Sequence, residues 1–309
     1  SASEQVKSAL GARDALFTSG GTEADNLAIK GLLRGQRGGG RVLYSAVEHP
    51  AVAAPCAAFA DNFEVASLPV RPDGLLDLEA ARALMTPDTR LICLMQVNNE
   101  TGAVQPLREL IALRDERCGE AWLHVDGVQG FLRLPIGLGD GADSYAISGH
   151  KIHGPKGIGA LALGKRGKLV PQLFGGGQEN GLRPGTENTA GIAGLQAAMH
   201  NPPDAQKLRD MKLRLLEGIR SAIPEAQVNG PDPAGADSAP HILNLSFPPV
   251  KGQTFMHALE GRGVLVSQGA ACSSRQRKPS ATLTAMGLPK SRTDSAIRFS
   301  LGAQNTFEE

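Results

Sequence analysis

The chain has 309 residues, enough for about two domains, and its 41% hydrophobic and 20% charged residues are typical of a folded globular protein. The 32 Lys and Arg residues balance 31 Asp and Glu residues to a net charge of +1, so we expect no general attraction to nucleic acid or to an anionic membrane. Every apolar run is too short to cross a bilayer and no signal peptide opens the chain, so we expect no membrane partner. The four cysteines without CxxC spacing predict a protein of the reducing cytoplasm.

Strand-like and helical patterns alternate over the first two-thirds of the chain. Strands are predicted at residues 41–45, 63–67, 89–95, 122–126, 144–148 and 159–163, and helices at residues 23–33, 51–60, 78–85 and 107–117. This alternation predicts a parallel sheet covered by helices. Several strands are nearly continuous apolar runs, which indicates a sheet buried on both faces. Ligands of such sheets bind beyond the carboxyl ends of the strands.

A second region begins near Pro202 and Pro203. Its patterns predict, in order, a helix at 205–223, a Gly/Pro/Asp-rich loop at 229–240, a strand at 242–247, a helix at 253–260, a strand at 264–267, and a final helix and strand ending at Leu301. We therefore predict a large domain over residues 1–202 and a smaller α/β domain over residues 203–309.

Small and hydroxyl residues at positions 18–22 lead directly into the first predicted helix. The backbone N–H groups of such a helix start form an anion site, typically for phosphate. An ordinary helix start with Thr22 as the capping residue explains the segment equally simply, and alone it is the better explanation. The segment matches neither the P-loop pattern nor the dinucleotide fingerprint.

The strand at 144–148 runs into Ser148, His150 and Lys151. A lysine at a strand end among small residues can form a Schiff base with an aldehyde cofactor, although a surface lysine in a turn is the usual case. Asp126 ends the neighbouring strand, and an aspartate there can hold a pyridinium nitrogen. Its simpler explanation is a helix N-cap.

Two further polar segments follow predicted strands. His49 can stack on a planar ring or act as an acid or base, and a capping or packing histidine explains it equally well. The amides of segment 97–102 can reach a ring hydroxyl, but an Asn-rich turn is common.

The four cysteines show no CxxC spacing, so we expect neither a metal site nor a disulfide framework. Cys93 lies in an apolar strand and is expected to be a buried thiol, and Cys56 and Cys118 allow the same interpretation. Cys272 differs, because it lies among small polar residues near three basic side chains at 275–278 that favour a thiolate.

Eight segments occur in a fixed order: SGGTEADN, EHPAV, VNNETG, HVDGVQ, SGHKIHGPKG, GGGQENGLRPGTENTAG, ACSS and IRFSLG. This ordered set resembles the cysteine desulfurases of the NifS/IscS type, which are pyridoxal-phosphate enzymes of the class V aminotransferase group. The resemblance runs from about Phe17 to Leu301. It implies pyridoxal 5′-phosphate as the cofactor and the type I fold of these transferases, with a mostly parallel sheet in a large domain and a smaller C-terminal α/β domain.

The resemblance also implies a role for residues in each motif. The catalytic residues would be Lys151, Cys272 and His49. The cofactor would be bound by Gly21, Thr22, His49, Asn99, Asp126, Gln129, Ser148, His150, Lys151 and Thr186. The substrate would be bound by Arg298 and Asn99.

Within this set, Lys151 would carry the Schiff base and Asp126 would pair with the pyridine nitrogen. Thr186 would reach the cofactor phosphate of a partner subunit, which implies a homodimer. Arg298 would hold the substrate carboxylate as a two-pronged fork.

The implied reaction converts L-cysteine to L-alanine. Cys272 would take the sulfur as a persulfide and pass it to an acceptor or an iron–sulfur scaffold protein for iron–sulfur cluster or thio-cofactor synthesis. The resemblance places an N-terminal segment with an LDxxATT-type motif before Ser1 and further helix after the IRFSLG strand, so the chain is expected to lack both.

Two alternatives remain at this point. A selenocysteine lyase or another class V aminotransferase would share the fold, but a transaminase needs no thiol such as Cys272. An inactive scaffold or sulfur-relay protein would also share it, although the presence of Lys151, Asp126 and His49 is evidence against loss of the site.

Overall fold

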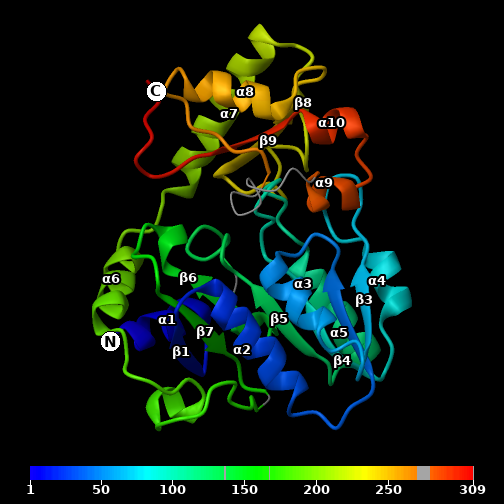
Figure 1. The fold of residues 1–309 in the computed structure, drawn as a ribbon, viewed down its shortest axis with the longest axis vertical. Coiled ribbons are helices and arrows are strands. Elements are labelled where there is room, and N and C mark those ends of the chain that lie inside the picture. The colour runs from blue at the N-terminus through cyan, green and yellow to red at the C-terminus, as the bar shows by residue number, and fades with distance from the viewer. Residues whose placement is uncertain (136, 167, 270–278, 309) are drawn as a thin grey trace. The chain divides into compact units, whose positions relative to one another are not determined.

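The computed structural model describes residues 1–135, 137–166, 168–269 and 279–308 (Figure 1). The chain divides into two compact units. The first unit consists of Ser1–Leu68, Asp77–Gln96 and Pro106–Pro202. The second unit consists of Pro69–Leu76, Val97–Gln105 and Pro203–Glu309, so it takes two short segments from the first half of the chain.

A seven-stranded sheet forms the centre of the first unit, in the order β1-β7-β6-β5-β4-β2-β3. Its strands are β1 (Asp14–Thr18), β2 (Arg41–Ser45), β3 (Glu64–Leu68), β4 (Thr89–Cys93), β5 (Trp122–Asp126), β6 (Ser144–Ser148) and β7 (Gly159–Leu163). Strands β6, β5, β4, β2 and β3 are parallel neighbours, which confirms the predicted parallel sheet for these five.

Strand β7 departs from the predicted parallel arrangement. It runs antiparallel to both β6 and β1. Only residues 149–158 connect β6 to β7, whereas a parallel crossover needs roughly a dozen residues or more. The short connection therefore allows a reversal but no crossover helix.

The helices of the first unit are α1 (Ala2–Leu10), α2 (Gly21–Leu33), α3 (Pro50–Ala57), α4 (Leu78–Leu84), α5 (Leu107–Cys118) and α6 (Thr189–Met199). Three 3₁₀ turns are η1 (Leu138–Asp140), η2 (Gly149–Ile152) and η3 (Gln178–Gly181). Helices α1 and α6 and strand β1 were not among the predicted elements.

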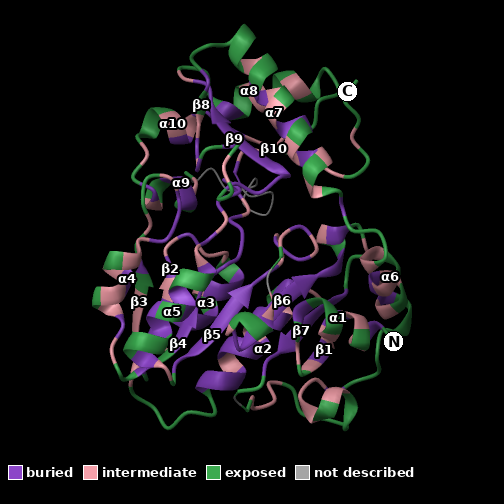
Figure 2. Cartoon of the chain, turned by 180° about the vertical axis from the view of Figure 1, so that it is seen from behind, coloured by how far each residue is buried: buried purple, intermediate pink, exposed green. Residues whose placement is uncertain are grey.

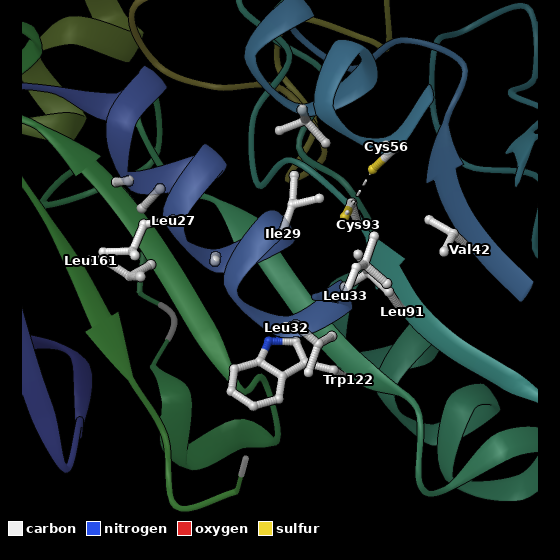
Figure 3. Packing of buried hydrophobic residues seen from close by; sticks show 14 of the residues in the cluster. Leu27, Ile29, Leu32, Leu33, Val42, Cys56, Leu91, Cys93, Trp122 and Leu161 are labelled. Carbon is white, nitrogen blue, oxygen red and sulfur yellow. Dashed lines mark hydrogen bonds between the residues drawn. The ribbon is translucent and has the colours of Figure 1, made fainter. Parts of the chain in front are cut away.

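Helix α2 packs along the central strands and supplies much of the core (Figure 3). Its Leu27, Ile29 and Leu32 belong to one buried cluster with Leu91 on β4 and Leu161 on β7. Every residue of β5, β6 and β7 is buried (Figure 2). The continuous apolar strands thus lie in a sheet covered on both faces, as predicted.

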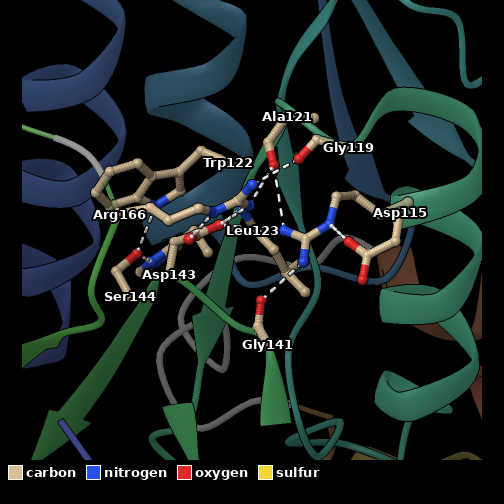
Figure 4. A network of polar contacts seen from close by, with 11 residues as sticks. Asp115, Gly119, Ala121, Trp122, Leu123, Gly141, Asp143, Ser144 and Arg166 are labelled. Carbon is tan, nitrogen blue, oxygen red and sulfur yellow. Dashed lines mark hydrogen bonds and ion pairs between the residues drawn. The ribbon is translucent and has the colours of Figure 1, made fainter. Parts of the chain in front are cut away.

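The amino ends of β5 and β6 are held by a polar network around the buried Asp143 (Figure 4). The Arg166 guanidinium donates to both carboxylate oxygens of Asp143 at 2.7 and 2.8 Å, and Arg114 donates to one at 3.2 Å. The backbone N–H of Leu123 donates to the same carboxylate at 2.8 Å. This network fixes the end of the sheet opposite the carboxyl ends of β5 and β6.

The second unit contains a three-stranded antiparallel sheet in the order β10-β9-β8. Its elements are α7 (Ala205–Ala222), β8 (Gln227–Val228), β9 (Ile242–Ser246), α8 (Gly252–Glu260), α9 (Ala281–Ala285), α10 (Lys290–Asp294) and β10 (Ala296–Ser300). Leu216, Leu245, Ile297 and Phe299 belong to its core.

The strand predicted at 264–267 is wrong. Only Ser267 pairs, in an isolated bridge with Arg298, and the Leu265 side chain is 82% exposed. Among the described residues, no helix is long and apolar enough to cross a membrane.

Candidate active site

The carboxyl edge of the sheet collects several of the predicted site residues of the first unit. Strand β5 ends at Asp126, β6 ends at Ser148, and Lys151 follows in the turn η2. His49 lies just beyond the end of β2. Parallel neighbours end at the same edge of a sheet, and this edge is where open α/β sheets bind their ligands.

Asp126 is the buried acid of this edge. Its Oδ1 accepts a hydrogen bond from the backbone N–H of Val128 at 3.0 Å. Burial raises the pKa of Asp126, while the Val128 hydrogen bond and the nearby His49 and Lys151 side chains oppose the rise. The structure therefore brings Asp126, His49 and Lys151 into one electrostatic cluster.

Lys151 lies in a turn whose backbone is fixed by a buried arginine. Its carbonyl oxygen accepts a hydrogen bond from the guanidinium of Arg133, a residue that is 9% exposed. Burial lowers the pKa of Arg133 to about 10, so this arginine keeps its charge at neutral pH. The Lys151 side chain itself is half-buried.

His49 is the N-cap of α3. Sequence analysis offered a capping or packing histidine as one of two interpretations of this residue. Its Nδ1 accepts a hydrogen bond from the backbone N–H of Ala51 at 3.1 Å. A neutral imidazole that accepts at Nδ1 carries its proton on Nε2. The cap thus fixes the ring's orientation and leaves Nε2 as its donor.

The amino end of α2 lacks the side-chain cap that Thr22 was suggested to provide. The N-cap is Gly20, no side chain caps the helix, and Thr22 is exposed. The Glu23 carboxylate instead accepts from the backbone N–H of Ser19 at 2.6 Å. A helix start without a side-chain acceptor keeps its backbone N–H groups and the positive end of its dipole for an anion.

Gly21 brings this helix start against the ends of β5 and β6. A Cβ atom at Gly21 would lie 2.6 Å from Cγ2 of Val128 and 3.6 Å from Cβ of Ser148. Ser148 Oγ is 3.0 Å from Nδ1 of His150. Partial burial and the nearby charges of Lys151 and Lys156 lower the pKa of His150. The helix start, Ser148 and His150 thus form a small polar cradle.

Sequence analysis missed three buried titratable groups in the first unit. The carboxyl of Glu48 accepts from the backbone N–H of Met95 at 2.6 Å, and Asp25 on α2 lies 3.1 Å from His124 on β5. Burial, with the charge of Asp126 next, raises the pKa of both Asp25 and Glu48 well above its usual range. Only His124 gave a signal in the sequence, because it lies within the apolar strand Trp122–Asp126.

The second unit brings together Asn99 and Arg298. Nη1 of Arg298 donates to the backbone carbonyl of Asn99 at 2.7 Å, and Nη2 lies 3.4 Å from Oγ of Ser267. Thr186 is exposed in the first unit, after η3. Cys272 lies outside the described residues.

Comparisons with known proteins agree with this geometry. The family described as aminotransferase class-V matches residues 1–309. The cysteine desulfurase IscS of Clostridium botulinum is 38% identical over 319 aligned positions, which cover 100% of this chain and 79% of the relative. The human cysteine desulfurase is 37% identical, with 100% of this chain and 68% of the relative covered.

Two solved structures have the same fold. A NifS-like protein superposes with a TM-score of 0.90 at 32% identity, covering 99% of this chain and 82% of that chain. A structure described as SspA in complex with cysteine superposes with a TM-score of 0.83 at 33% identity, covering 97% of this chain and 85% of that chain.

The fold and the sheet edge define a pyridoxal-phosphate enzyme of fold type I. The chain belongs to the class V aminotransferase family, in which these relatives are cysteine desulfurases. The residues present fit the cofactor. A buried acid next to Lys151 suits a protonated ring nitrogen, and the helix start beside Ser148 suits a phosphate.

Proposed function

We propose that this chain is a pyridoxal-phosphate-dependent cysteine desulfurase that converts L-cysteine to L-alanine and passes the sulfur to an acceptor. The observation that carries the proposal is the cluster of Asp126, His49 and Lys151 beside the uncapped start of α2. The relatives named cysteine desulfurases support the choice of substrate.

Each predicted site residue has a part in this proposal. Asp126 would hold the ring nitrogen, His49 would stack on the ring, and Lys151 would bind the cofactor covalently. The phosphate would be held by Gly21, Thr22, Ser148 and His150, and by Thr186 from a partner subunit. The ring hydroxyl would be contacted by Asn99 and Gln129. When bound, pyridoxal phosphate accepts the electron pair that is left at the substrate α-carbon.

The chain's own groups then divide the remaining work. Arg298 would bind the substrate carboxylate, because its guanidinium matches the two carboxylate oxygens. The Nζ amine of Lys151 would take the α-proton, and the imidazole of His49 would move a proton within the same cluster.

Cys272 would carry the sulfur. Its thiolate would attack the substrate sulfur, so that a sulfur–sulfur bond forms as the carbon–sulfur bond breaks. The electron pair of the broken bond ends in a new C–H bond of alanine. L-Cysteine and one protein thiol thus give L-alanine and one protein persulfide, without an external oxidant or reductant.

The proposal extends to the chain's partners. We infer a homodimer, because Thr186 is expected to act on the cofactor of a second subunit. The persulfide sulfur would pass to an acceptor or iron–sulfur scaffold protein in the cytoplasm, for iron–sulfur cluster or thio-cofactor synthesis.

Alanine release from L-cysteine tests the proposed function. The purified chain, loaded with pyridoxal phosphate and supplied with a thiol reductant, should form L-alanine and sulfide in equal amounts. L-Selenocysteine in place of L-cysteine tests the lyase alternative in the same assay. Alanine from L-selenocysteine but not from L-cysteine would overturn the proposal, and so would cofactor absorbance without any alanine.

A further inference from the structure

The segment Val97–Gln105 belongs to the second unit, and a tight turn at its centre orients Glu100. Oδ1 of Asn98 accepts from the backbone N–H groups of Glu100 and Thr101, both at 2.9 Å, and from the Thr101 hydroxyl at 3.1 Å. Asn98 is fully buried. The direction of Glu100 is therefore set by its own turn.

The Glu100 carboxyl lies near two described residues that flank the segment carrying Cys272. Oε2 of Glu100 accepts from the hydroxyl of Ser280 at 2.6 Å, and a Cβ atom at Gly269 would lie 3.2 Å from the same oxygen. Gly269 directly precedes residues 270–278, and Ser280 follows them by two positions. One carboxylate oxygen thus lies close to the residues on either side of this segment.

Gly269 adopts a backbone conformation that favours glycine. Its φ of +70° lies in the left-handed region, which glycine adopts without the strain that a side chain would bring. The missing side chain also lets the backbone come close to the carboxyl of Glu100.

The same short segment also holds Arg298. The carbonyl of Asn99 accepts from Arg298, while the carbonyl of Glu100 accepts from Nδ2 of Asn244 at 3.0 Å. Asn244 on β9 pairs with Arg298 on β10. Two backbone hydrogen bonds tie Ser267 to Arg298, at 2.7 and 3.1 Å. The guanidinium expected to bind substrate is therefore connected through a few hydrogen bonds to Ser267 and Ser280, which lie on either side of the Cys272 segment in the sequence.

The cap of α9 does not depend on the Glu100 carboxyl. Ser280 already caps α9 by accepting from the backbone N–H of Leu283 at 3.1 Å, which needs no acid. Glu100 is only 7% exposed, and burying an acid is unfavourable unless its contacts compensate. A contact of 2.6 Å is typical of a charge-assisted hydrogen bond between a hydroxyl and a carboxylate.

We propose that Glu100 is a positioning residue for sulfur transfer, which holds Ser280 by a hydrogen bond while Gly269 passes close to the same carboxyl, and so fixes the described residues that flank the Cys272 segment relative to Arg298. This inference rests on the proposed function, and it gives Glu100 no contact with substrate.

Single-turnover measurements with L-cysteine on the cofactor-loaded full chain test this role. Persulfide on the Cys272 peptide and alanine are followed in time, and cysteine binding is followed by the cofactor absorbance. In Glu100→Ala, persulfide formation should slow by on the order of tenfold to a hundredfold, the scale on which misplaced reacting groups act. Its affinity for cysteine should stay within about twofold of wild type, since Arg298 keeps its contacts in this variant.

Matched variants separate positioning from charge and from general stability. Glu100→Gln keeps an acceptor for Ser280 without the charge, so it should restore most of the lost rate. Ser280→Ala should slow persulfide formation too, and the double variant with Glu100→Ala should be no slower than the slower single variant, because both single variants remove the Glu100–Ser280 hydrogen bond and Ser280→Ala alone also removes the cap of α9. Glu225→Ala, which changes an exposed glutamate of the second unit, should behave like wild type.

An unchanged persulfide rate in Glu100→Ala would overturn the positioning role, and so would equal losses in Glu100→Ala and Glu100→Gln. Should Glu100→Ala fail to bind the cofactor, Ser280→Ala decides, and an unchanged rate there would also overturn the role. Absence of alanine with wild type would instead contradict the proposed function, so the two failures are distinguishable.

Discussion

Nε2 of His124 lies 3.1 Å from Oδ1 of Asp25, and both side chains are fully buried in the first unit. On its other side, Nδ1 of His124 lies 2.8 Å from Oγ of Ser144, which accepts from the indole N–H of Trp122 at 3.0 Å. Burial lowers the pKa of His124 to about 3 and raises the pKa of Asp25 well above its usual range. At neutral pH we therefore expect an uncharged His124 imidazole beside the Asp25 carboxyl.

Stability against acid follows from this pair. Unfolded His124 binds a proton near pH 6.5, whereas the folded side chain does so near pH 3. The unfolded state therefore binds more protons between these values, and the free energy of unfolding falls as pH decreases through this window. Between pH 7 and pH 5 the loss from His124 should be about 2 kcal/mol.

Denaturant unfolding of wild type and His124→Gln at both pH values measures this loss. Asp25 acts in the opposite direction, since a raised pKa favours the folded state at low pH, but it is present in both proteins. The wild type should lose more stability than the variant. Equal losses would mean that folded His124 takes up a proton as readily as the unfolded chain does.

The sheet could be predicted largely from the sequence, because its strands are short apolar runs between polar loops. Strands β2, β5, β6 and β7 begin and end where they were predicted. The reversal of β7 was missed because apolar patterns carry no direction, although the short connection from Ser148 to Gly159 contained the information. The pattern at 264–267 was misleading, because only Ser267 finds a partner strand.

Lys151→Ala should abolish the absorbance of the lysine–cofactor Schiff base. The variant removes the proposed attachment amine, whereas the phosphate cradle and Asp126 stay in place. Absorbance spectra after loading with pyridoxal phosphate and gel filtration measure the result. Lys156→Ala, which changes an exposed lysine in the same loop, is the control and should keep the wild-type spectrum. An unchanged spectrum in Lys151→Ala would move the attachment to another lysine.

Gly21→Ala should weaken binding of pyridoxal phosphate. The added Cβ would meet Val128 at 2.6 Å, so the helix start or the turn after β5 must shift, at about 1–3 kcal/mol. Gly218→Ala is the matched control, because Gly218 lies in α7 with no atom within 4 Å of the added Cβ. It should raise stability by about 0.5–1 kcal/mol. Cofactor affinity is measured by titration. An affinity equal to that of wild type in Gly21→Ala would contradict phosphate binding at the start of α2.

Arg298→Lys should raise KM for L-cysteine by about tenfold, which corresponds to ~1.4 kcal/mol. The ammonium cannot donate in parallel to both carboxylate oxygens, and it also loses one of the contacts to Asn99 and Ser267. Steady-state alanine formation measures KM. Arg262→Lys, at an exposed arginine of the second unit, should leave KM unchanged. Normal saturation in Arg298→Lys would exclude the substrate role.

The candidate site was predictable only in part. Motif order along the chain pointed to Lys151 and Asp126, and their shared edge follows from parallel strands. The partner of Glu100 was not predictable, because its hydrogen bond with Ser280 joins positions far apart in the sequence. Hydrophobic periodicity in a sequence predicts single helices and strands. Contacts such as that of Glu100 with Ser280 depend instead on how distant segments pack together.

In the proposed reaction, sulfur leaves L-cysteine as a persulfide on Cys272. The most direct measurement is mass spectrometry of the Cys272 peptide after one turnover with L-cysteine carrying a heavy sulfur isotope, without reductant. We predict one heavy sulfur atom on this peptide for each alanine formed, and neither product in Cys272→Ala, whose cofactor spectrum should be unchanged. Alanine formed by wild type with the label on another residue, or full turnover by Cys272→Ala, would contradict the account.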